Sequence, residues 1–573
     1  LLLAASDAAF SPNGDKVQDV MTFTPVSGQS ANVTKYTFKI LNEKAEVVYQ
    51  KSENKKLPSS IQWNGKANDG TLGSDGTYSA VLDIETANGS SSSAATGAFG
   101  LDTVAPSFMA ETPWADFSPD GDGNQDTIPV KVLNCSSEKS WTCDIQNAKK
   151  DVVKKITWNG VIRDFEWDGT DESGNIAADG VYSMVFNGRD EAGNSFKSEI
   201  KNISLDNRET KVYVITENEG ISPNGDGVLD TQIFEIKTTL NENITNWKFE
   251  VSREDGTSVR SWSEKDQADL PSKITWDGFD SNGNVCEGTF YGRLEVVYKK
   301  GNRVSPVSSL FLCTATAPKL RVQTAPEYFS PDNDGVDDDL FIKLTGTTKA
   351  RIKNWSFTIN DPKGKAFWKT AGKSQITERI IWDGLSNVQK DANGNAERVQ
   401  SAMDYPYTFT VTDNLGMTST VEGVIPVDVL VIRDGNLLKM AVPSIIFESD
   451  AANFQNANAK LTQAQIDNNI KTLNRIADIL KKFKDYKVTI VGHANKITDN
   501  PDEETVDNPR DWGRASMPLS KERADAIKAY LTKRGVNAAA LSTEGMGGTK
   551  PVVNPKDKDN NWKNRRVEFI LVK

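Results

Sequence analysis

The chain has 573 residues, more than one hydrophobic core usually supports, so several domains are expected. Its 79 acidic residues outnumber its 67 basic residues, and the net charge is −12 at pH 7. This balance argues against a protein that binds nucleic acid or anionic membrane surfaces, because both functions need basic patches. No apolar run approaches the length that crosses a bilayer, so no membrane-spanning segment is expected.

The chain begins with the apolar and small residues Leu1-Leu-Leu-Ala-Ala-Ser6. Such a stretch is typical of the end of a cleaved export signal, and it is also compatible with the start of a mature chain.

Two short motifs alternate along the first three quarters of the chain. The first occurs at Phe10-Ser-Pro-Asn-Gly-Asp15, Phe117-Ser-Pro-Asp-Gly-Asp122, Ile221-Ser-Pro-Asn-Gly-Asp226 and Phe329-Ser-Pro-Asp-Asn-Asp334. The second follows each copy of the first, at Trp63-Asn-Gly65, Trp167-Asp-Gly169, Trp276-Asp-Gly278 and Trp382-Asp-Gly384. Nearly constant spacing indicates four tandem repeats. One tryptophan at a fixed place in each repeat favours a core residue over a ligand platform, with the residues after it forming a turn.

An alternating strand completes each repeat, as in Tyr78/Ala80/Leu82/Ile84, Tyr182/Met184/Phe186, Phe290/Leu294/Val296 and Tyr407/Phe409/Val411. Short alternating strands separated by Gly, Asn and Asp turns are typical of an immunoglobulin-type β-sandwich. Proline-containing joints separate the repeats. We predict repeat 1 at residues 1–104, repeat 2 at 105–208, repeat 3 at 209–318 and repeat 4 at 319–428.

A different pattern follows a linker at residues 429–442. Helical spacing of apolar residues from Thr462 to about Phe483 predicts an amphipathic helix, and Val488 and Ile490 alternate as in a strand. A second helix is expected from Leu519, with Ser520 as its N-cap. Two strands should follow, at Leu541–Glu544 and Val567–Leu571. Residues 443–573 are therefore predicted to form an α/β sandwich, which makes the fold class tandem all-β sandwiches followed by an α/β domain.

Four cysteines fall into two local pairs, Cys135 with Cys143 and Cys286 with Cys313. The first pair flanks a polar loop in an expected hairpin, and the second lies on strands around the turn Lys299–Asn302. Two disulfides are our hypothesis for an exported protein, and four separate thiols are the alternative.

The first motif places oxygen-bearing side chains at alternate positions, as calcium loops do. The strongest candidates are Asp120, Asp122, Asn124 and Asp126 in repeat 2 and Asp332 and Asp334 in repeat 4. The bidentate Glu of a full EF-hand loop is missing, and Asn13 and Asn224 replace the first Asp in the other repeats. A tight turn closed by side-chain-to-backbone hydrogen bonds explains the motif without metal, so neither metal nor cofactor is expected.

Catalysis finds little support in the sequence. The single histidine, His493, follows a strand end and has no nucleophile motif beside it, so we expect it to be structural. One histidine and four cysteines do not suffice for a zinc centre if the cysteines are paired. Carboxylates are numerous, so counting alone leaves a glycosidase-type pair as an alternative, but repeats of this kind use Asp in turns and we expect no enzyme.

Residues 7–428 resemble bacterial Ig-like modules of the flagellar hook-capping and gliding-motility-associated type, which share the Phe-Ser-Pro-Asn-Gly-Asp opening and the Trp-Asp-Gly turn. The resemblance is strongest in repeats 2 and 3. It implies an extended, non-enzymatic spacer or interaction array and does not fix a partner. Our hypothesis is that the repeats meet another envelope protein.

The C-terminal region resembles the OmpA-like domain, which associates non-covalently with peptidoglycan in the periplasm. The resemblance rests on Gly492-His-Ala-Asn495, Leu519-Ser-Lys-Glu-Arg523-Ala524, Gly545-Met-Gly547 and Asn564-Arg-Arg-Val-Glu568. In that family an Asp and an Arg hold the ammonium and the carboxylate of diaminopimelate in the stem peptide. Arg523 occupies the Arg position, whereas Asn495 replaces the Asp. Asn564 and Arg566 are expected to brace the pocket wall, although Arg566 could simply pair with a surface carboxylate.

The segment from Lys496 to Pro518 is longer than the usual family loop and holds Pro501, Pro509, Trp512 and several acidic residues. It could replace the lost charge, for example through Asp499, or cover the pocket. Two functions therefore stay open. One is a structural envelope protein at peptidoglycan with weakened or altered binding, and the other is a protein-binding scaffold or adhesin without such binding. A wall-remodelling enzyme is a third, less favoured hypothesis.

Overall fold

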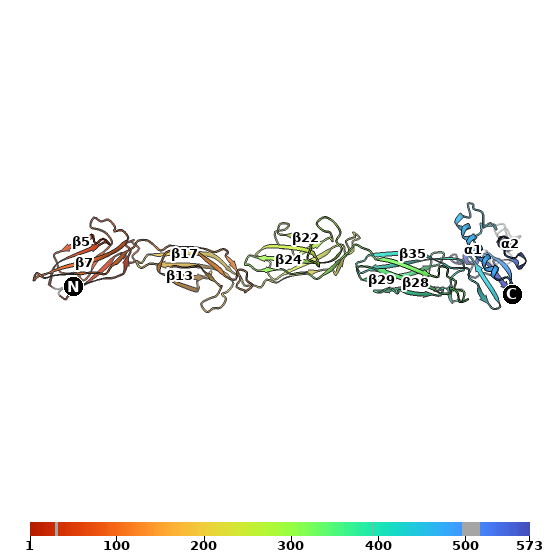
Figure 1. Ribbon diagram of the computed structural model, residues 1–573, viewed down its shortest axis with the longest axis horizontal. Coiled ribbons are helices and arrows are strands. Elements are labelled where there is room, and N and C mark those ends of the chain that lie inside the picture. Colours follow the sequence, from red (N-terminus) through yellow and green to blue (C-terminus); the bar gives the residue numbers. More distant parts are fainter. Residues whose placement is uncertain (29–31, 392, 496–515) are drawn as a thin grey trace. The chain divides into compact units, whose positions relative to one another are not determined.

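The computed structural model describes residues 1–28, 32–391, 393–495 and 516–573 (Figure 1). The chain divides into two compact units. The first comprises residues 1–217, 233–275 and 290–310, and the second comprises residues 218–232, 276–289 and 311–573. Strands dominate the described residues, and both α-helices found there lie near the C-terminus, which confirms the predicted fold class.

Repeat 1 consists of two sheets around one core. The strand order is β1-β3-β6 in one sheet and β2-β9-β7-β4-β5 in the other, with β8 paired to β7. Every second residue along most of β4 and β7 is buried, because successive side chains of a strand point to opposite faces. The strands are β1 (Leu2–Ala5), β2 (Ala9–Phe10), β3 (Met21–Val26), β4 (Val33–Leu41), β5 (Val47–Glu53), β6 (Ile61–Trp63), β7 (Gly76–Thr86), β8 (Ser91–Ala95) and β9 (Phe99–Leu101).

Repeat 2 has the same plan, with sheets of order β10-β12-β15 and β11-β17-β16-β13-β14. Its strands are β10 (Phe108–Glu111), β11 (Asp116–Phe117), β12 (Ile128–Cys135), β13 (Glu138–Gln146), β14 (Val152–Gly160), β15 (Phe165–Trp167), β16 (Gly180–Arg189) and β17 (Ser195–Leu205).

Repeat 3 pairs β18 with β20, β21 with both β22 and β24, and β19 with β26. Its strands are β18 (Val212–Thr216), β19 (Gly220–Ile221), β20 (Gln232–Thr238), β21 (Ile244–Arg253), β22 (Ser258–Ser263), β23 (Lys273–Trp276), β24 (Gly288–Tyr298), β25 (Arg303–Val304) and β26 (Phe311–Cys313).

Repeat 4 differs from the others by an added hairpin. Its sheets have the order β27-β28-β31 and β30-β29-β34-β35, and the hairpin pairs β32 with β33. The other repeats have a single isolated bridge after the tryptophan turn, at Lys66 with Leu72, Thr170 with Ile176 and Phe279 with Val285. The strands are β27 (Lys319–Ala325), β28 (Leu340–Thr347), β29 (Ile352–Asn360), β30 (Ala366–Lys373), β31 (Arg379–Trp382), β32 (Leu385–Lys390), β33 (Ala396–Arg398), β34 (Asp404–Asp413) and β35 (Thr418–Pro426).

The four motif tryptophans are core residues, as the sequence predicts. Each is at most 1% exposed, and each indole Nε1 donates a hydrogen bond to the backbone carbonyl three residues later, so burial leaves no polar atom unpaired. The acceptors are the carbonyls of Lys66, Thr170, Phe279 and Leu385, at 2.8–3.0 Å. The glycine of each motif has a positive φ that the turn requires, for example +76° at Gly169.

The C-terminal domain has a five-stranded sheet of order β36-β37-β40-β38-β39, in which only β38 and β39 run parallel. Its helices pack apolar residues such as Leu473, Ile476 and Ile527 into the same core as Ile490 and Phe569 of the sheet. The elements are β36 (Ile432–Asp434), β37 (Leu437–Val442), α1 (Gln463–Lys482), β38 (Lys487–His493), α2 (Ser516–Lys533), η3 (Ala538–Ala540), β39 (Leu541–Gly547), η4 (Asn561–Asn564) and β40 (Val567–Val572).

The predicted start of the first helix agrees with the structure, whereas the predicted N-cap of the second helix does not. Helix α1 begins after Thr462, which forms a capping box with Gln465. Helix α2 covers Ser516–Lys533, so its described part already includes the three residues before Leu519. Ser520 is therefore not the N-cap that we predicted. Its hydroxyl donates to the Met517 carbonyl and accepts from Gly547 N, which ties α2 to β39.

The structure draws no disulfide between the four cysteines, and the two pairs stay a prediction. Cys135 ends β12 in one sheet of repeat 2, whereas Cys143 lies in β13 of the other sheet, so they do not flank one hairpin. Burial raises the pKa of the Cys143 thiol to about 12, which keeps it protonated and unreactive. In repeat 3, Cys313 Sγ donates to the Cys286 carbonyl at 3.1 Å.

Candidate functional site

Two asparagines meet where β38 ends. Asn564 Nδ2 donates to Asn495 Oδ1 at 2.9 Å, and Asn495 Nδ2 lies 3.4 Å from the Pro555 carbonyl. Asn564 is fully buried, and its Oδ1 accepts hydrogen bonds from the N–H groups of Val552 and Val553. The amide of Asn564 therefore fixes both the loop that precedes it and the side chain of Asn495.

Arg523 lies in the second turn of α2, half-buried. Its Nε donates to the Ala451 carbonyl at 3.0 Å and its Nη2 to the Glu448 carbonyl at 3.2 Å. The guanidinium also stacks on Phe447, with its carbon 5.0 Å from the ring centroid. These contacts hold Arg523 against the segment that precedes α1.

Arg566 belongs to a buried ionic cluster around Glu568. Its Nε donates to Glu568 Oε1 at 2.7 Å, and Lys439 Nζ lies 2.9 Å from Glu568 Oε2. Burial by itself raises the pKa of Glu568. The adjacent His493 and the charges of Arg566 and Lys439 outweigh burial, so the pKa lies well below the ordinary value. Arg566 thus pairs with a buried carboxylate, not with a carboxylate at the surface.

His493 is only 4% exposed, and its Nε2 lies 3.5 Å from Glu568 Oε2. Its place beside this ionic cluster agrees with a structural residue.

The structure connects three of the four candidate residues. Asn495 is hydrogen-bonded to Asn564, and Arg566 Nη1 lies 3.5 Å from the Asn564 carbonyl. Arg523 is the fourth residue, and its hydrogen bonds hold it to the segment before α1 instead. Residues 496–515, including Asp499, lie outside the described residues. Glu568 was not singled out from the sequence as a site residue, although it ends the Asn-Arg-Arg-Val-Glu motif.

The first motif of each repeat forms a loop of one design, which we call the opening loop (residues 11–19, 118–126, 222–230 and 330–338). The last Asp of each loop accepts two or more backbone N–H groups from the loop's middle, as Asp126 does from Gly121 and Gly123. This is the side-chain-to-backbone turn that the sequence suggested as the metal-free explanation. The sequence analysis missed Asp338, which takes this place in repeat 4.

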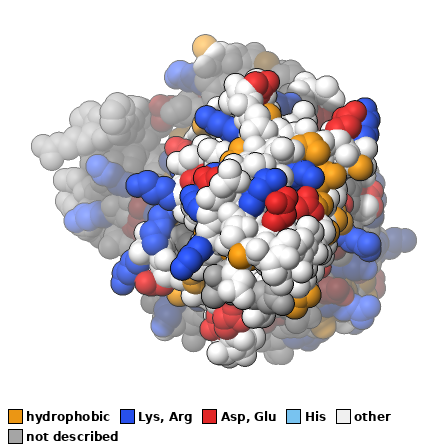
Figure 2. Space-filling model, turned by 90° about the vertical axis from the view of Figure 1, so that its left-hand side faces the viewer, with side chains coloured by type: hydrophobic (Ala, Val, Ile, Leu, Met, Phe, Trp, Pro, Cys, Tyr) orange, Lys and Arg blue, Asp and Glu red, His pale blue; other side chains and the backbone are white. Residues whose placement is uncertain are grey.

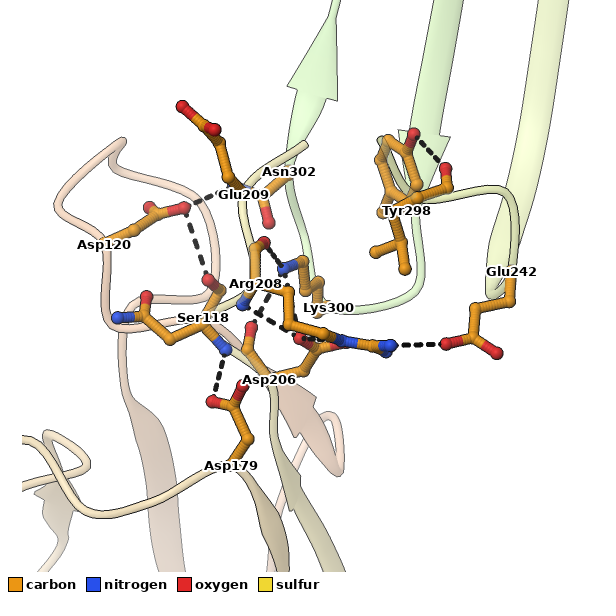
Figure 3. Close-up of polar contacts among 12 residues, drawn as sticks. Ser118, Asp120, Asp179, Asp206, Arg208, Glu209, Glu242, Tyr298, Lys300 and Asn302 are labelled. Atoms are coloured by element: carbon orange, nitrogen blue, oxygen red, sulfur yellow. Dashed lines mark hydrogen bonds and ion pairs between the residues drawn. The ribbon is translucent and has the colours of Figure 1, made fainter. Parts of the chain in front are cut away.

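In repeat 2 the opening loop meets a turn of repeat 3 (Figure 3). Asn302 is 4% exposed, and its Nδ2 donates to Asp120 Oδ2 at 2.6 Å and to Asp122 Oδ2 at 2.9 Å. Gln125 Nε2 reaches the Lys299 carbonyl at 3.3 Å. Asp120 and Asp122 converge with Asp126, with oxygens within 4.8 Å of one another, whereas Asn124 uses its amide within the loop.

A buried lysine completes this joint. Lys300 Nζ donates to the backbone carbonyls of Asp206 and Arg208 and lies 3.4 Å from Asp206 Oδ1 (Figure 3). Arg208 bridges Asp206 and Glu242, and its hydrogen bonds lower the pKa of Asp206 to about 2. The joint between repeats 1 and 2 uses neutral amides in the same place, where Asn13 Nδ2 donates to Asn194 Oδ1 at 3.0 Å.

Among the described residues, no counterpart of Asn302 contacts the opening loop of repeat 4. Asp332 Oδ2 accepts from Val431 N at 2.9 Å, whereas Asp332 Oδ1 is buried with no hydrogen-bond partner in the described structure. Asp334 and Asp338 lie beside it. Burial, together with the charges of Asp334 and Asp338, raises the pKa of Asp332.

Lys and Arg side chains are interspersed with Asp and Glu on the face drawn in Figure 2. In the part of the chain that the structure describes, neither helix combines the length and the apolar character that a membrane crossing requires.

Family models match three regions of the chain. The OmpA family matches residues 453–565, the CHU_C Type IX secretion signal domain matches residues 4–97, and the FlgD Ig-like domain matches residues 121–195. The chain therefore carries an OmpA domain at its C-terminal end, with CHU_C and FlgD Ig-like domains upstream.

The chain is similar to the peptidoglycan-binding protein ArfA of Mycobacterium tuberculosis (strain ATCC 25618 / H37Rv), with 35% identity over 118 residues that cover 21% of this chain and 31% of that protein. It is also similar to the probable lipoprotein YiaD of Escherichia coli (strain K12), with 27% identity over 144 residues that cover 25% of this chain and 55% of that protein. The chain thus spans only about a third to a half of the length of these relatives. A crystal structure of a tetra-tandem repeat in the extending region of a large adhesion protein covers 74% of this chain and 99% of its own, at 13% identity and a TM-score of 0.26.

Proposed function

We propose that this chain is a non-enzymatic structural protein of the cell envelope whose C-terminal domain is positioned at peptidoglycan in the periplasm. The OmpA domain supports this proposal, as does the similarity to a protein named as peptidoglycan-binding. The Ig-like repeats then form an array that contacts another envelope protein. No cofactor is part of the proposal.

The contact between Asn495 and Asn564 carries the proposal. A buried amide with four hydrogen bonds holds Asn495 at the end of β38, where the resemblance places the ammonium-binding Asp. These hydrogen bonds support a ligand site that keeps its architecture and has a neutral group in place of the anionic one. Arg523 remains on α2 as the candidate partner of a ligand carboxylate, since a guanidinium fork matches a carboxylate.

The exchange of Asp for Asn predicts weakened or altered binding. An amide oxygen still accepts a hydrogen bond from an ammonium, but it supplies no charge to offset the cost of removing that ammonium from water. A hydrogen bond to a charged group contributes about 1.5–3 kcal/mol, which corresponds to roughly tenfold to a hundredfold in affinity.

A protein-binding scaffold or adhesin is the second candidate function. The hydrogen bonds of Arg523 to the carbonyls of Ala451 and Glu448 favour it, because a guanidinium that serves the fold in this way has fewer donors left for a ligand. In that case the OmpA domain has no peptidoglycan activity.

Binding of the full chain to purified sacculi and to a diaminopimelate-containing stem peptide tests the proposal. We expect Asn495→Asp to raise the affinity by roughly tenfold or more, because Asn564 Nδ2 can donate to a carboxylate as it does to an amide. Arg523→Ala should lower the affinity by a similar factor, and Arg523→Lys should restore part of it.

The exposed Arg534 directly after α2 offers a matched control, since Arg534→Ala removes an arginine next to the same helix at a distance from the candidate residues. Circular dichroism and the melting midpoint show whether each variant keeps its fold. If neither the parent chain nor Asn495→Asp binds, the peptidoglycan proposal fails and the scaffold function is left.

A further inference from the structure

The hairpin that distinguishes repeat 4 contacts the C-terminal domain. Glu397 on β33 forms an ion pair with Lys563 in η4, and the two side chains are only 12% and 5% exposed. Gln400 Nε2 also donates to Glu397 Oε1, at 3.3 Å. Repeats 1 to 3 have a short bridge at the place of this hairpin, so the contact belongs to the part of repeat 4 that departs from the repeat pattern.

Other contacts join the same two parts of the chain. Lys365 Nζ lies 2.5 Å from Asp559 Oδ2, and Lys363 Nζ lies 5.6 Å from the ring centroid of Trp562. In addition, Asp428 at the end of repeat 4 accepts a bidentate pair of hydrogen bonds from Arg475 on α1, with Nε donating to Oδ1 at 3.1 Å and Nη2 donating to Oδ2 at 2.7 Å. Both exposed and buried charges therefore hold repeat 4 against the C-terminal domain.

Lys563 is directly followed by Asn564, the residue that fixes Asn495 and the N–H groups of Val552 and Val553. One peptide bond thus separates the ion pair with repeat 4 from the amide that shapes the candidate site. We infer that repeat 4 positions the peptidoglycan site of the C-terminal domain, with Glu397 and Lys563 as positioning residues that act through Asn564. This inference rests on the proposed function for its ligand.

The physical reason is the burial of the pair. A buried ammonium needs a charged partner, because little water reaches the ammonium to solvate it once the carboxylate is removed. If Glu397 becomes neutral, Lys563 must move toward solvent, and η4 and Asn564 move with it. In the pair of Lys365 with Asp559 both side chains are exposed. Loss of this ion pair therefore leaves the remaining charge in water and η4 in place.

Hydrogen exchange of the full chain tests this without any ligand. In Glu397→Gln we expect the exchange of the Val552 and Val553 amides to rise by about tenfold, and that of the central turns of α1 to stay within twofold of the parent. The sacculus affinity should fall by about tenfold in the same variant. The reversed pair, Glu397→Lys with Lys563→Glu, should recover most of both effects, which a general loss of stability would not do.

Lys365→Gln is the matched control, and we expect it to change neither exchange at Val552 and Val553 nor affinity. Unchanged exchange in Glu397→Gln would overturn the inference, and so would an increase spread equally over α1. If the parent chain does not bind sacculi, the proposed function fails. The exchange data then decide separately whether repeat 4 positions Asn564.

Discussion

The opening loops of repeats 2 and 4 share the Ser-Pro-Asp start, but different groups face their paired carboxylates. In repeat 2, Asn302 of the next repeat donates to both Asp120 and Asp122. In repeat 4 the corresponding pair is Asp332 and Asp334, and Asp332 Oδ1 is buried without a hydrogen bond in the described structure. A buried carboxylate oxygen without a donor is destabilising, so one sequence motif has opposite energetic consequences at its two places.

Repeats 1 and 3 show how the same problem is solved within a loop. They carry Asn13 and Asn224 in place of the first Asp, and the amide of each donates to the Asp two residues later, at 3.2 and 2.9 Å. In three of the four opening loops, a side-chain amide therefore donates a hydrogen bond to the acidic residues at these positions. Repeat 4 is the exception, and its loop precedes the C-terminal domain instead of another Ig-like repeat.

Acidification should affect the two regions in opposite directions, and this is the largest effect that we expect. The pKa of Asp206, at the joint of repeats 2 and 3, is lowered to about 2, so its stabilisation is present above its ordinary pKa near 4 and is lost as the pH falls through about 2. The pKa of Asp332 is raised, because its charged form is destabilised in the folded protein. That destabilisation is removed when Asp332 is protonated, as the pH falls through the raised pKa.

The measurement compares melting midpoints of the parent with Asp206→Asn and Asp332→Asn between pH 7 and pH 2.5. At pH 7 we expect Asp206→Asn to lower the free energy of unfolding by about 2 kcal/mol and Asp332→Asn to raise it. Both differences from the parent should become smaller in acid. A shift of the melting midpoint in the same direction for both variants at pH 7 would contradict the opposite roles of Asp206 and Asp332.

Removal of the bridging amide tests the repeat 2 side directly. Asn302→Ala leaves Asp120 and Asp122 as like charges without their shared donor, and we expect a loss of about 1–2 kcal/mol from the local stability of the loop. Hydrogen exchange of Gly121, Asp122 and Gly123 reports this loss. Asn284→Ala is the control, because Asn284 donates to Asp280 within its own turn, outside the joint.

The sequence predicts those features that repeat or that depend on local patterns. The four tryptophans, the turns after them and the amphipathic helix α1 follow from spacing and from residue type, and the structure confirms them. Ser520 shows the limit of a local pattern, because a serine before an apolar series resembles an N-cap even when it lies inside the helix.

The candidate site was predictable only in part. The motifs identify Asn495, Arg523, Asn564 and Arg566, but not what each side chain contacts. The pairing of Glu397 with Lys563 depends on how two domains meet, and no spacing in the sequence encodes that distance. The expected hairpin around Cys135 and Cys143 shows the same limit, since the two residues are close in sequence but belong to different sheets.

Asp332→Asn is a smaller, stabilising change. It gives repeat 4 the residue that repeats 1 and 3 already have, and its amide can donate to Asp334 as Asn224 does to Asp226. We expect about 0.5–1 kcal/mol of added stability at pH 7, because a buried charge is removed and a hydrogen bond is gained. Urea unfolding of the full chain measures it, with Asp337→Asn, an exposed position of the same loop, as the control.

Calcium should have the smallest effect. In the repeat 4 loop, both oxygens of Asp338, one oxygen of Asp334 and one of Asp332 already accept hydrogen bonds from the protein. A cation would have to replace or share these donors, and the ligand set lacks the bidentate Glu that strengthens calcium loops. We therefore expect the melting midpoint in millimolar calcium to match that in chelator, both for the parent and for Asp332→Asn. A rise seen in the parent and abolished by Asp332→Asn would instead place a cation against Asp332 Oδ1, and repeat 4 would then use a metal where repeat 2 uses Asn302.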